Sequence, residues 1–417
     1  MHSTRYCSLL IFTTLLIASI QAMAQAGQLD PTFGQGGIVT TDFGNSINSN
    51  IATANAVTIQ PDGKIVVCGG IPGSKGFPVP AVVRYNTDGS VDTAFGSSGI
   101  ASTPSEEDIS ASAIALQSDG KIVVSGFGNA IVVIRFTSNG TLDPTFGNNG
   151  IVTASDIFFN GTQTGLALQS DGKIVVAGSR VMERYLPNGQ SDSTFGKGNG
   201  VLLAGDAANA LAVLPNGKIL VASTNAATDF GPASGWVTRY NSNGSLDASF
   251  GIDGQLGATG LVNAMALLST GEFLIAGSLT SNITGPITGF AVSRDFGVGF
   301  PDPKFATHGA VVTPIANFPN IATSGLGVQL GGDIVVLGTA SAANLSNPVF
   351  ALARYTPAGQ LDTTFGTNGI VTTSFSGTNV VTAGGLTIQS DGKIVAVGSY
   401  EAGQDDTGFK LARYLGQ

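Results

Sequence analysis

The sequence predicts an all-β protein, a seven-bladed β-propeller built from four-stranded antiparallel blades. Three markers recur seven times each: an Asp-x-x-Phe motif, a glycine-containing hairpin, and an arginine near the end of an apolar run. Consecutive motifs lie 49 to 62 residues apart, a spacing typical of repeat architectures. The motif phenylalanines are Phe33, Phe95, Phe146, Phe195, Phe250, Phe305 and Phe365.

Each unit contains four short apolar runs separated by turn residues, which predicts four strands. The Ile-Val-Val runs do not alternate with polar residues, so both faces of these strands should be covered. Blades packed against blades provide that cover, and seven four-stranded units lie within the known propeller range. A parallel β-helix or open solenoid is the alternative, but such arrays need distinct end caps, and the last unit is as regular as the others.

The segments 142–147, Leu-Asp-Pro-Thr-Phe-Gly, and 167–178, Ala-Leu-Gln-Ser-Asp-Gly-Lys-Ile-Val-Val-Ala-Gly, resemble the bacterial delta-60 repeat family. The resemblance covers nearly the whole mature chain, and that family brings no activity to carry over. The unit also resembles NHL-type propeller repeats, which implies that the strand before the Asp-Gly hairpin is innermost. The chain would then begin with an outer strand and end one strand short after Tyr414. We therefore expect the N-terminal strand to join the C-terminal blade and close the ring.

Residues 1–26 have the pattern of a secretory signal peptide, followed by a single propeller domain over 27–417. Arg5 precedes an apolar stretch, and small residues around Ala24 form a cleavage site. The stretch is shorter than the ~20 apolar residues of a membrane span. We expect no transmembrane segment and a secreted, periplasmic or cell-surface protein. Removal of the signal leaves Cys68 as the only cysteine, predicted to be a small buried filler.

The charged residues divide into a repeated and a variable set. The chain carries 18 basic and 27 acidic residues with a net charge of -9, which makes nucleic acid a poor partner. Seven motif aspartates match seven repeat arginines, which predicts one ion pair per blade. Nothing in the sequence indicates self-association, and we expect a monomer.

The connections of variable length should share one face of the propeller, opposite the hairpins and Asp-x-x-Phe motifs, and a rigid scaffold with one variable face favours binding there. Acidic residues outnumber basic ones on these loops by ten to two, which favours a cation or a basic partner. Ordinary solvated loops explain the acids equally, and packing of a loop on its blade explains the single tryptophan. The candidate ligand-binding residues are Glu106, Glu107, Asp108, Asp206, Asp229, Trp236, Asp405 and Asp406.

The predicted function is an exported binding or interaction module for an unknown protein or glycan ligand. No catalytic or metal residues are predicted, because the mature chain has one histidine, His308, where sister units place a turn asparagine. No cofactor is predicted. Residues 86–92 weakly resemble a calcium loop, so calcium stays open. A carbohydrate-active enzyme using loop-face carboxylates and a structural envelope protein are the alternatives.

Overall fold

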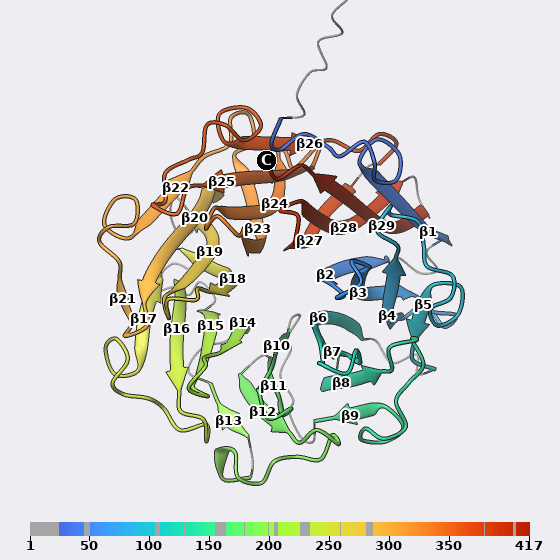
Figure 1. The fold of residues 1–417 in the computed structure, drawn as a ribbon, viewed down its shortest axis with the longest axis vertical. Helices are drawn as coiled ribbons and strands as arrows, with labels where there is room; N and C mark the ends of the chain where they lie inside the picture. Colours follow the sequence, from blue (N-terminus) through green and yellow to red (C-terminus); the bar gives the residue numbers. More distant parts are fainter. Residues whose placement is uncertain are drawn as a thin grey trace, which may run out of the picture.

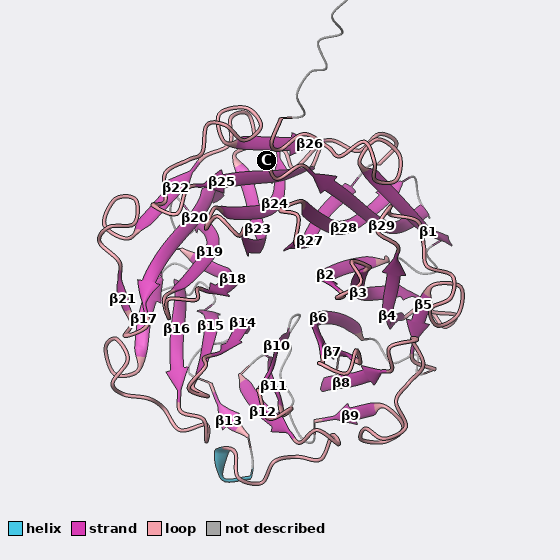
Figure 2. Ribbon diagram, viewed as in Figure 1, coloured by secondary structure: helices cyan, strands magenta, loops and turns pink. Residues whose placement is uncertain are grey.

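The computed structural model is a closed ring of seven antiparallel sheets around a central hub (Figure 1). It describes residues 25–45, 51–104, 109–128, 130–154, 164–178, 180–198, 200–203, 207–225, 234–258, 260–280, 287–378, 380–402 and 406–417. Figure 2 shows that strands dominate, with one three-residue 3-10 turn at Gly196–Gly198 as the helical element of the described chain. The predicted fold class is confirmed.

Blades 1 to 3 each contain four strands, which follow one another from hub to rim. Blade 1 has β2 (Thr53–Ile59), β3 (Ile65–Pro72), β4 (Pro78–Tyr85) and β5 (Ile100–Ser102). Blade 2 has β6 (Ser110–Leu116), β7 (Ile122–Phe127), β8 (Ile131–Phe136) and β9 (Ile151–Thr153). Blade 3 has β10 (Thr164–Leu168), β11 (Ile174–Gly178), β12 (Val181–Tyr185) and β13 (Val201–Leu202).

Blades 4 to 6 repeat this order, with one extra short strand in blade 5. Blade 4 has β14 (Ala207–Val213), β15 (Ile219–Asn225), β16 (Ser234–Tyr240) and β17 (Gln255–Ala258). Blade 5 has β18 (Leu261–Leu267), β19 (Phe273–Thr280) and β20 (Ile287–Phe296), and β20 pairs with both β21 (Phe300–Pro301) and β22 (Ala310–Thr313). Blade 6 has β23 (Asn320–Val328), β24 (Ile334–Ser341), β25 (Val349–Tyr355) and β26 (Ile370–Thr373).

Blade 7 joins the two ends of the chain, as expected. Its inner strands are β27 (Val380–Ile388), β28 (Ile394–Ala402) and β29 (Asp406–Tyr414), and its outer strand is β1 (Ile38–Asn45). The strands β1 and β29 pair antiparallel, with Ile38 opposite Ala412. A bridge between Leu29 and Tyr414 extends the same junction. The ring is therefore closed by strand pairing between the two ends of the sequence.

The core lies between neighbouring blades. On β3, Ile65 and Val67 pack in a cluster with blade 7, whereas Val66 and Cys68 pack in a cluster with blade 2. Both faces of the strand are thus buried, which explains why its apolar run does not alternate with polar residues. Cys68 is fully buried, and burial raises the pKa of its thiol to about 12. The predicted role of a small filler is confirmed.

Each blade is fastened by a latch, which we define as the repeat arginine with the motif aspartate and phenylalanine. In blade 3, Arg184 Nε donates to Asp192 Oδ2 at 2.8 Å, and the guanidinium Cζ lies 4.6 Å from the centroid of Phe195. Lys173 Nζ lies 3.4 Å from the same carboxylate. The predicted arginine–aspartate ion pair is confirmed in all seven blades: Arg84–Asp92, Arg135–Asp143, Arg184–Asp192, Arg239–Asp247, Arg294–Asp302, Arg354–Asp362 and Arg413–Asp30.

Blade 5 departs from the repeat in its core. Asp295 occupies the position that Tyr85, Tyr240 and Tyr355 hold in sister blades, and it is 2 % exposed. Burial raises the pKa of this carboxyl to about 6, although a hydrogen bond from Ser293 opposes the shift. The position therefore holds a buried acid that is protonated more readily than an ordinary aspartate.

Candidate functional site

The described parts of the chain contain two of the eight predicted ligand-binding residues, Trp236 and Asp406. Trp236 lies on β16 of blade 4 and Asp406 on β29 of blade 7, so the structure does not bring them together. The other six lie outside the described residues: Glu106, Glu107, Asp108, Asp206, Asp229 and Asp405.

Trp236 packs on its own blade. Its side chain is half-buried, and its Nε1 donates to Ser234 Oγ at 3.2 Å. The ring lies over Gly257 of the outer strand, where an added Cβ would meet it at 3.6 Å. These contacts favour packing on the blade, which was one of the two predicted explanations of the tryptophan.

Asp406 belongs to a polar cluster at the ring closure. Burial and a hydrogen bond with the Asp42 carboxyl raise the pKa of Asp406. Tyr400 Oη lies 3.5 Å from Asp406 Oδ1, and the Tyr400 ring carries the Lys410 ammonium 4.5 Å from its centroid. Lys410 Nζ also donates to Thr40 Oγ1 at 2.7 Å. Asp406 therefore lies among polar side chains of blade 7.

The hub opens on the variable-loop face through a ring of bulged residues, which we call the hub mouth. In six inner strands the register shifts by one residue near the loop-face end, as between Ala54 and Ala56 of β2. A bulge turns its extra residue out of the ladder. These residues, with Thr164 in blade 3, line a pocket of about 340 Å³: Asn55, Ser112, Thr164, Asn209, Asn263, Ser324 and Gly384.

The hub mouth has the chemistry of a neutral hydrogen-bonding site. Every described residue that lines it is small and uncharged. Asn55 Nδ2 donates to the Ala111 carbonyl at 2.8 Å, and Asn209 Nδ2 donates to the Val262 carbonyl at 2.7 Å, both in the next blade. Since a backbone carbonyl can only accept, these contacts fix the amide orientation and leave each Oδ1 as a free acceptor among the described residues.

Below the mouth the channel becomes apolar. A second pocket of about 240 Å³ continues inward from the mouth and is lined first by Ala and Gly and then by larger apolar side chains. The larger side chains come from all seven inner strands: Val57, Ile114, Leu166, Leu211, Met265, Leu326 and Leu386. A ligand at the mouth would therefore meet hydrogen-bonding groups around its edge and an apolar floor.

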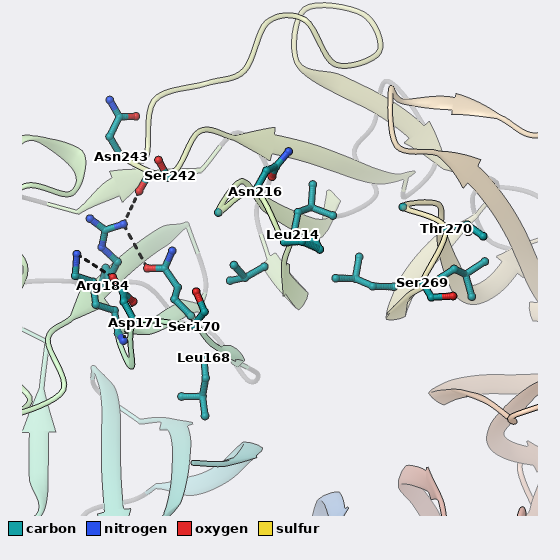
Figure 3. A pocket seen from close by; sticks show the side chains of 18 of the residues that line it. Leu168, Ser170, Asp171, Arg184, Leu214, Asn216, Ser242, Asn243, Ser269 and Thr270 are labelled. Carbon is teal, nitrogen blue, oxygen red and sulfur yellow. Dashed lines mark hydrogen bonds and ion pairs between the residues drawn. The ribbon is translucent and has the colours of Figure 1, made fainter. Parts of the chain in front are cut away.

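The opposite face carries two clefts between hairpins, one on each side of the hub axis. The interior cleft, of about 1070 Å³, spans blades 3, 4 and 5 and includes Arg184, Leu214 and Asn243 (Figure 3). In it, Arg184 donates to the Ser242 carbonyl of the next blade and to Gln169 Oε1 at 3.4 Å. The closure cleft, of about 1020 Å³, spans blades 6, 7 and 1 at the junction of the chain ends.

The hub mouth was not predicted from the sequence, although a signal was present. The mouth residue lies eight positions before the hairpin glycine in every unit, from Asn55 and Gly63 to Gly384 and Gly392. A polar residue at a fixed distance from a turn in most repeats indicates a shared position in space. The loop acids vary more between units, and the sequence therefore predicted a binding site at the loops instead.

Metal chemistry finds little support within the described residues. They contain no group of three or more His, Cys, Asp or Glu side chains that could hold a metal ion. His308 has φ +59° in the turn after Phe305, where sister units place Asn149 and Asn368 with φ near +50°. Its predicted role as a turn residue is confirmed. None of the described helical segments is long and apolar enough to span a membrane.

Comparison with known proteins agrees with the fold. Six segments match the family model described as "Domain of unknown function (DUF5122) beta-propeller": residues 60–95, 117–146, 169–195, 214–250, 332–365 and 389–416. No curated protein matches the sequence.

Among solved structures, a catalytically inactive virginiamycin B lyase from Staphylococcus aureus with quinupristin is similar at 11% identity and a TM-score of 0.50, covering 90% of this chain and 99% of that one. A protein of unknown function from Dyadobacter fermentans has 11% identity and a TM-score of 0.47, covering 91% and 100%. YCF48 from Cyanidioschyzon merolae has 9% identity and a TM-score of 0.45, covering 89% and 98%. At such identities the likeness concerns the fold alone. With its six matching segments and its closed ring of sheets, the chain is a β-propeller built from sequence repeats.

Proposed function

We propose that this protein is an exported binding module that takes a neutral, hydroxyl-rich ligand, such as a sugar, at the hub mouth. The observation that carries the proposal is the convergence of six uncharged Asn, Ser and Thr side chains and one glycine on a single pocket, each from a different blade. Concave pockets with a few convergent polar groups are the usual sites for small ligands, and 340 Å³ falls within their size range.

The chemistry of the mouth favours a sugar over an ion. The free Oδ1 atoms of Asn55 and Asn209 accept hydrogen bonds, and the hydroxyl groups of the ring both donate and accept. The apolar neck below would contact the C–H face of a pyranose ring. The predicted signal peptide at residues 1–26 supports an extracytoplasmic site of action, and the resemblance to delta-60 repeat proteins supports assignment to that family.

The test begins with the mature protein on an array of neutral oligosaccharides, and the strongest sugar is then titrated by calorimetry. Asn263→Leu places a branched apolar side chain in the mouth without removing a hydrogen bond to any described residue. We expect it to weaken sugar binding by about tenfold or more, equivalent to about 1.4 kcal/mol. Ser170→Leu, on an exposed hairpin of the opposite face, is the matched control and should bind normally. Absence of any bound sugar, or equal binding by both variants, would contradict the proposal.

A further inference from the structure

The closure cleft contains two buried amide groups that the fold does not use. In blades 2, 3 and 6 the residue three positions before the hairpin glycine is a glutamine whose Oε1 accepts from the arginine of the same blade. The contacts are Arg135 to Gln117 at 3.5 Å, Arg184 to Gln169 at 3.4 Å and Arg354 to Gln329 at 3.3 Å.

The same glutamine in blades 1 and 7 has no such partner. Gln60 and Gln389 both line the closure cleft, and the Oε1 atom of each is buried without a hydrogen bond within the described structure. Gln60 is 8 % exposed. A buried acceptor without a donor destabilises the fold, so a ligand that supplies the donor recovers that free energy.

The arginine of blade 7 makes the same latch contacts as its sister arginines. Arg413 Nε donates to Asp30 Oδ2 at 2.8 Å, its Nη2 donates to Thr32 Oγ1 at 3.1 Å, and its Nη1 donates to the Thr87 carbonyl. Lys393 Nζ lies 3.3 Å from the Asp30 carboxylate and 3.1 Å from that of Asp391. The basic groups that line the cleft are thus already paired, and they offer little to an anionic ligand.

The closure cleft also contains apolar and acidic groups. Ile59, Val328 and Ile388 line it from three inner strands. Leu330 replaces the Ser or Pro of sister hairpins and is 90 % exposed at the rim. Asp88 lies on the outer side, with Oδ1 accepting from the Ser90 amide at 2.9 Å, which leaves Oδ2 available to a cation.

We propose that the closure cleft is a second binding site, independent of the hub mouth, for a primary amine with an apolar body. The ammonium or amine N–H groups donate to the Oε1 atoms of Gln60 and Gln389. Small rotations of the two side chains bring these oxygen atoms to the surface of the cleft. The apolar body covers Leu330 and the aliphatic side chains of the inner strands. The interior cleft lacks this capacity, because its blades 4 and 5 carry Leu214 and Leu268 at the glutamine positions.

The experiment uses 2-phenylethylamine as the probe in titration calorimetry with the mature protein, and 3-phenylpropionate as a probe that has the same ring but an anionic group. We expect the amine to bind and the carboxylate not to bind. The double variant Gln60→Leu with Gln389→Leu should weaken amine binding by about tenfold or more, because two hydrogen-bond acceptors are lost. The matched control, Gln117→Leu with Gln169→Leu, removes two glutamines that already have partners and should leave the affinity unchanged.

A melting curve of each variant establishes that it is folded, and a rise in the melting temperature of the unaltered protein with amine concentration provides a second readout. The proposal is overturned if the amine does not bind, if both double variants bind it equally, or if the carboxylate binds as well as the amine.

Discussion

The interior cleft and the closure cleft are built from the same repeat and have nearly the same volume, about 1070 and 1020 Å³, but they differ in chemistry. In the interior cleft the chain runs continuously from blade to blade, and the variable hairpin position carries Leu214 and Leu268. In the closure cleft the two chain ends meet, and the same position carries Gln389 and Gln60. Because both clefts contain the same latches, we infer that the residue three positions before the hairpin glycine distinguishes what each cleft can bind.

The largest effect is expected when the junction of the two chain ends is removed, a junction that lies at the closure cleft and not at the interior cleft. Deleting residues 25–42 removes Asp30 and Phe33 of the blade 7 latch and most of β1. Blade 7 would lose its outer strand and its latch together, so we expect the single cooperative melting transition to be lost. Circular dichroism during thermal unfolding measures this, with a circular permutant opened at the hairpin 170–171 of the interior cleft as the control. An unchanged melt in the deletion variant would contradict closure by β1.

A smaller effect is expected from breaking one latch, either in blade 7 at the closure cleft or in blade 3 at the interior cleft. Asp30→Ala and Asp192→Ala each leave an arginine buried without its carboxylate, which should cost about 3 to 5 kcal/mol in the free energy of unfolding. Only Asp30→Ala should also free the N-terminal segment, detectable as faster proteolysis there. Urea denaturation measures both, and Asp171→Ala, whose side chain is 55 % exposed, should lose no more than about 1 kcal/mol. Equal protease resistance of the two latch variants would contradict the idea that the blade 7 latch holds the N-terminal segment.

Exchanging the distinguishing residues should have opposite effects in the two clefts. Gln60 and Leu214 are both 8 % exposed at the same repeat position. Gln60→Leu removes a buried unsatisfied amide and should raise the free energy of unfolding by about 1 to 3 kcal/mol, whereas Leu214→Gln should lower it by a similar amount. Paired urea titrations test this, and destabilisation by both substitutions would show that Gln60 has a partner inside the fold.

Asp30 of blade 7 and Asp295 of blade 5 should contribute to the pH dependence of stability with opposite signs. Although burial opposes the shift, hydrogen bonds from Thr32 and the charges of Arg413 and Lys393 lower the pKa of Asp30 to about 2. Its contribution to stability is therefore complete above the unfolded pKa near 4 and is lost as the pH falls toward 2. The pKa of Asp295 is raised by burial to about 6, so its contribution is present below pH 4 and is lost as the pH rises through 6.

The smallest expected effect on stability is that of replacing Asp295, whose contribution falls as the pH rises. Asp295→Asn removes the ionisable group, so the variant should gain stability relative to the unaltered protein between pH 4 and 7.5. Urea midpoints at pH 4, 5, 6 and 7.5 measure the gain. A difference that stays constant over this range would show that Asp295 does not titrate as its burial requires.

The repeat determined how much of the fold could be predicted. The Asp-x-x-Phe motif, the hairpin glycine and the arginine recur because each blade needs its latch and its hairpin, and their count therefore indicates the number of blades. The strand order follows from the Asp-Gly hairpins together with the resemblance to NHL-type repeats. The full length of β1 was not predicted, because residues 42–45 are mostly polar or small and extend the strand only through pairing with β29.

The sites were less predictable, since they depend on contacts between units. Nothing local to Asn55 shows that its amide reaches the carbonyl of Ala111 in the next blade. In the same way, Gln60 and Gln117 have similar sequence surroundings, yet only Gln117 has its arginine within 3.5 Å. Six of the predicted loop residues lie outside the described structure, and their role in binding remains a prediction.

We infer that repeat positions with satisfied polar groups serve the architecture, whereas those left unsatisfied identify a binding site. Side-chain amide NMR signals of the glutamines, followed during titration with 2-phenylethylamine, test this most directly. We predict that the signals of Gln60 and Gln389 shift together and saturate, while those of Gln117 and Gln169 stay in place. Uniform shifts of all four signals, or no shift at Gln60 and Gln389, would contradict the claim.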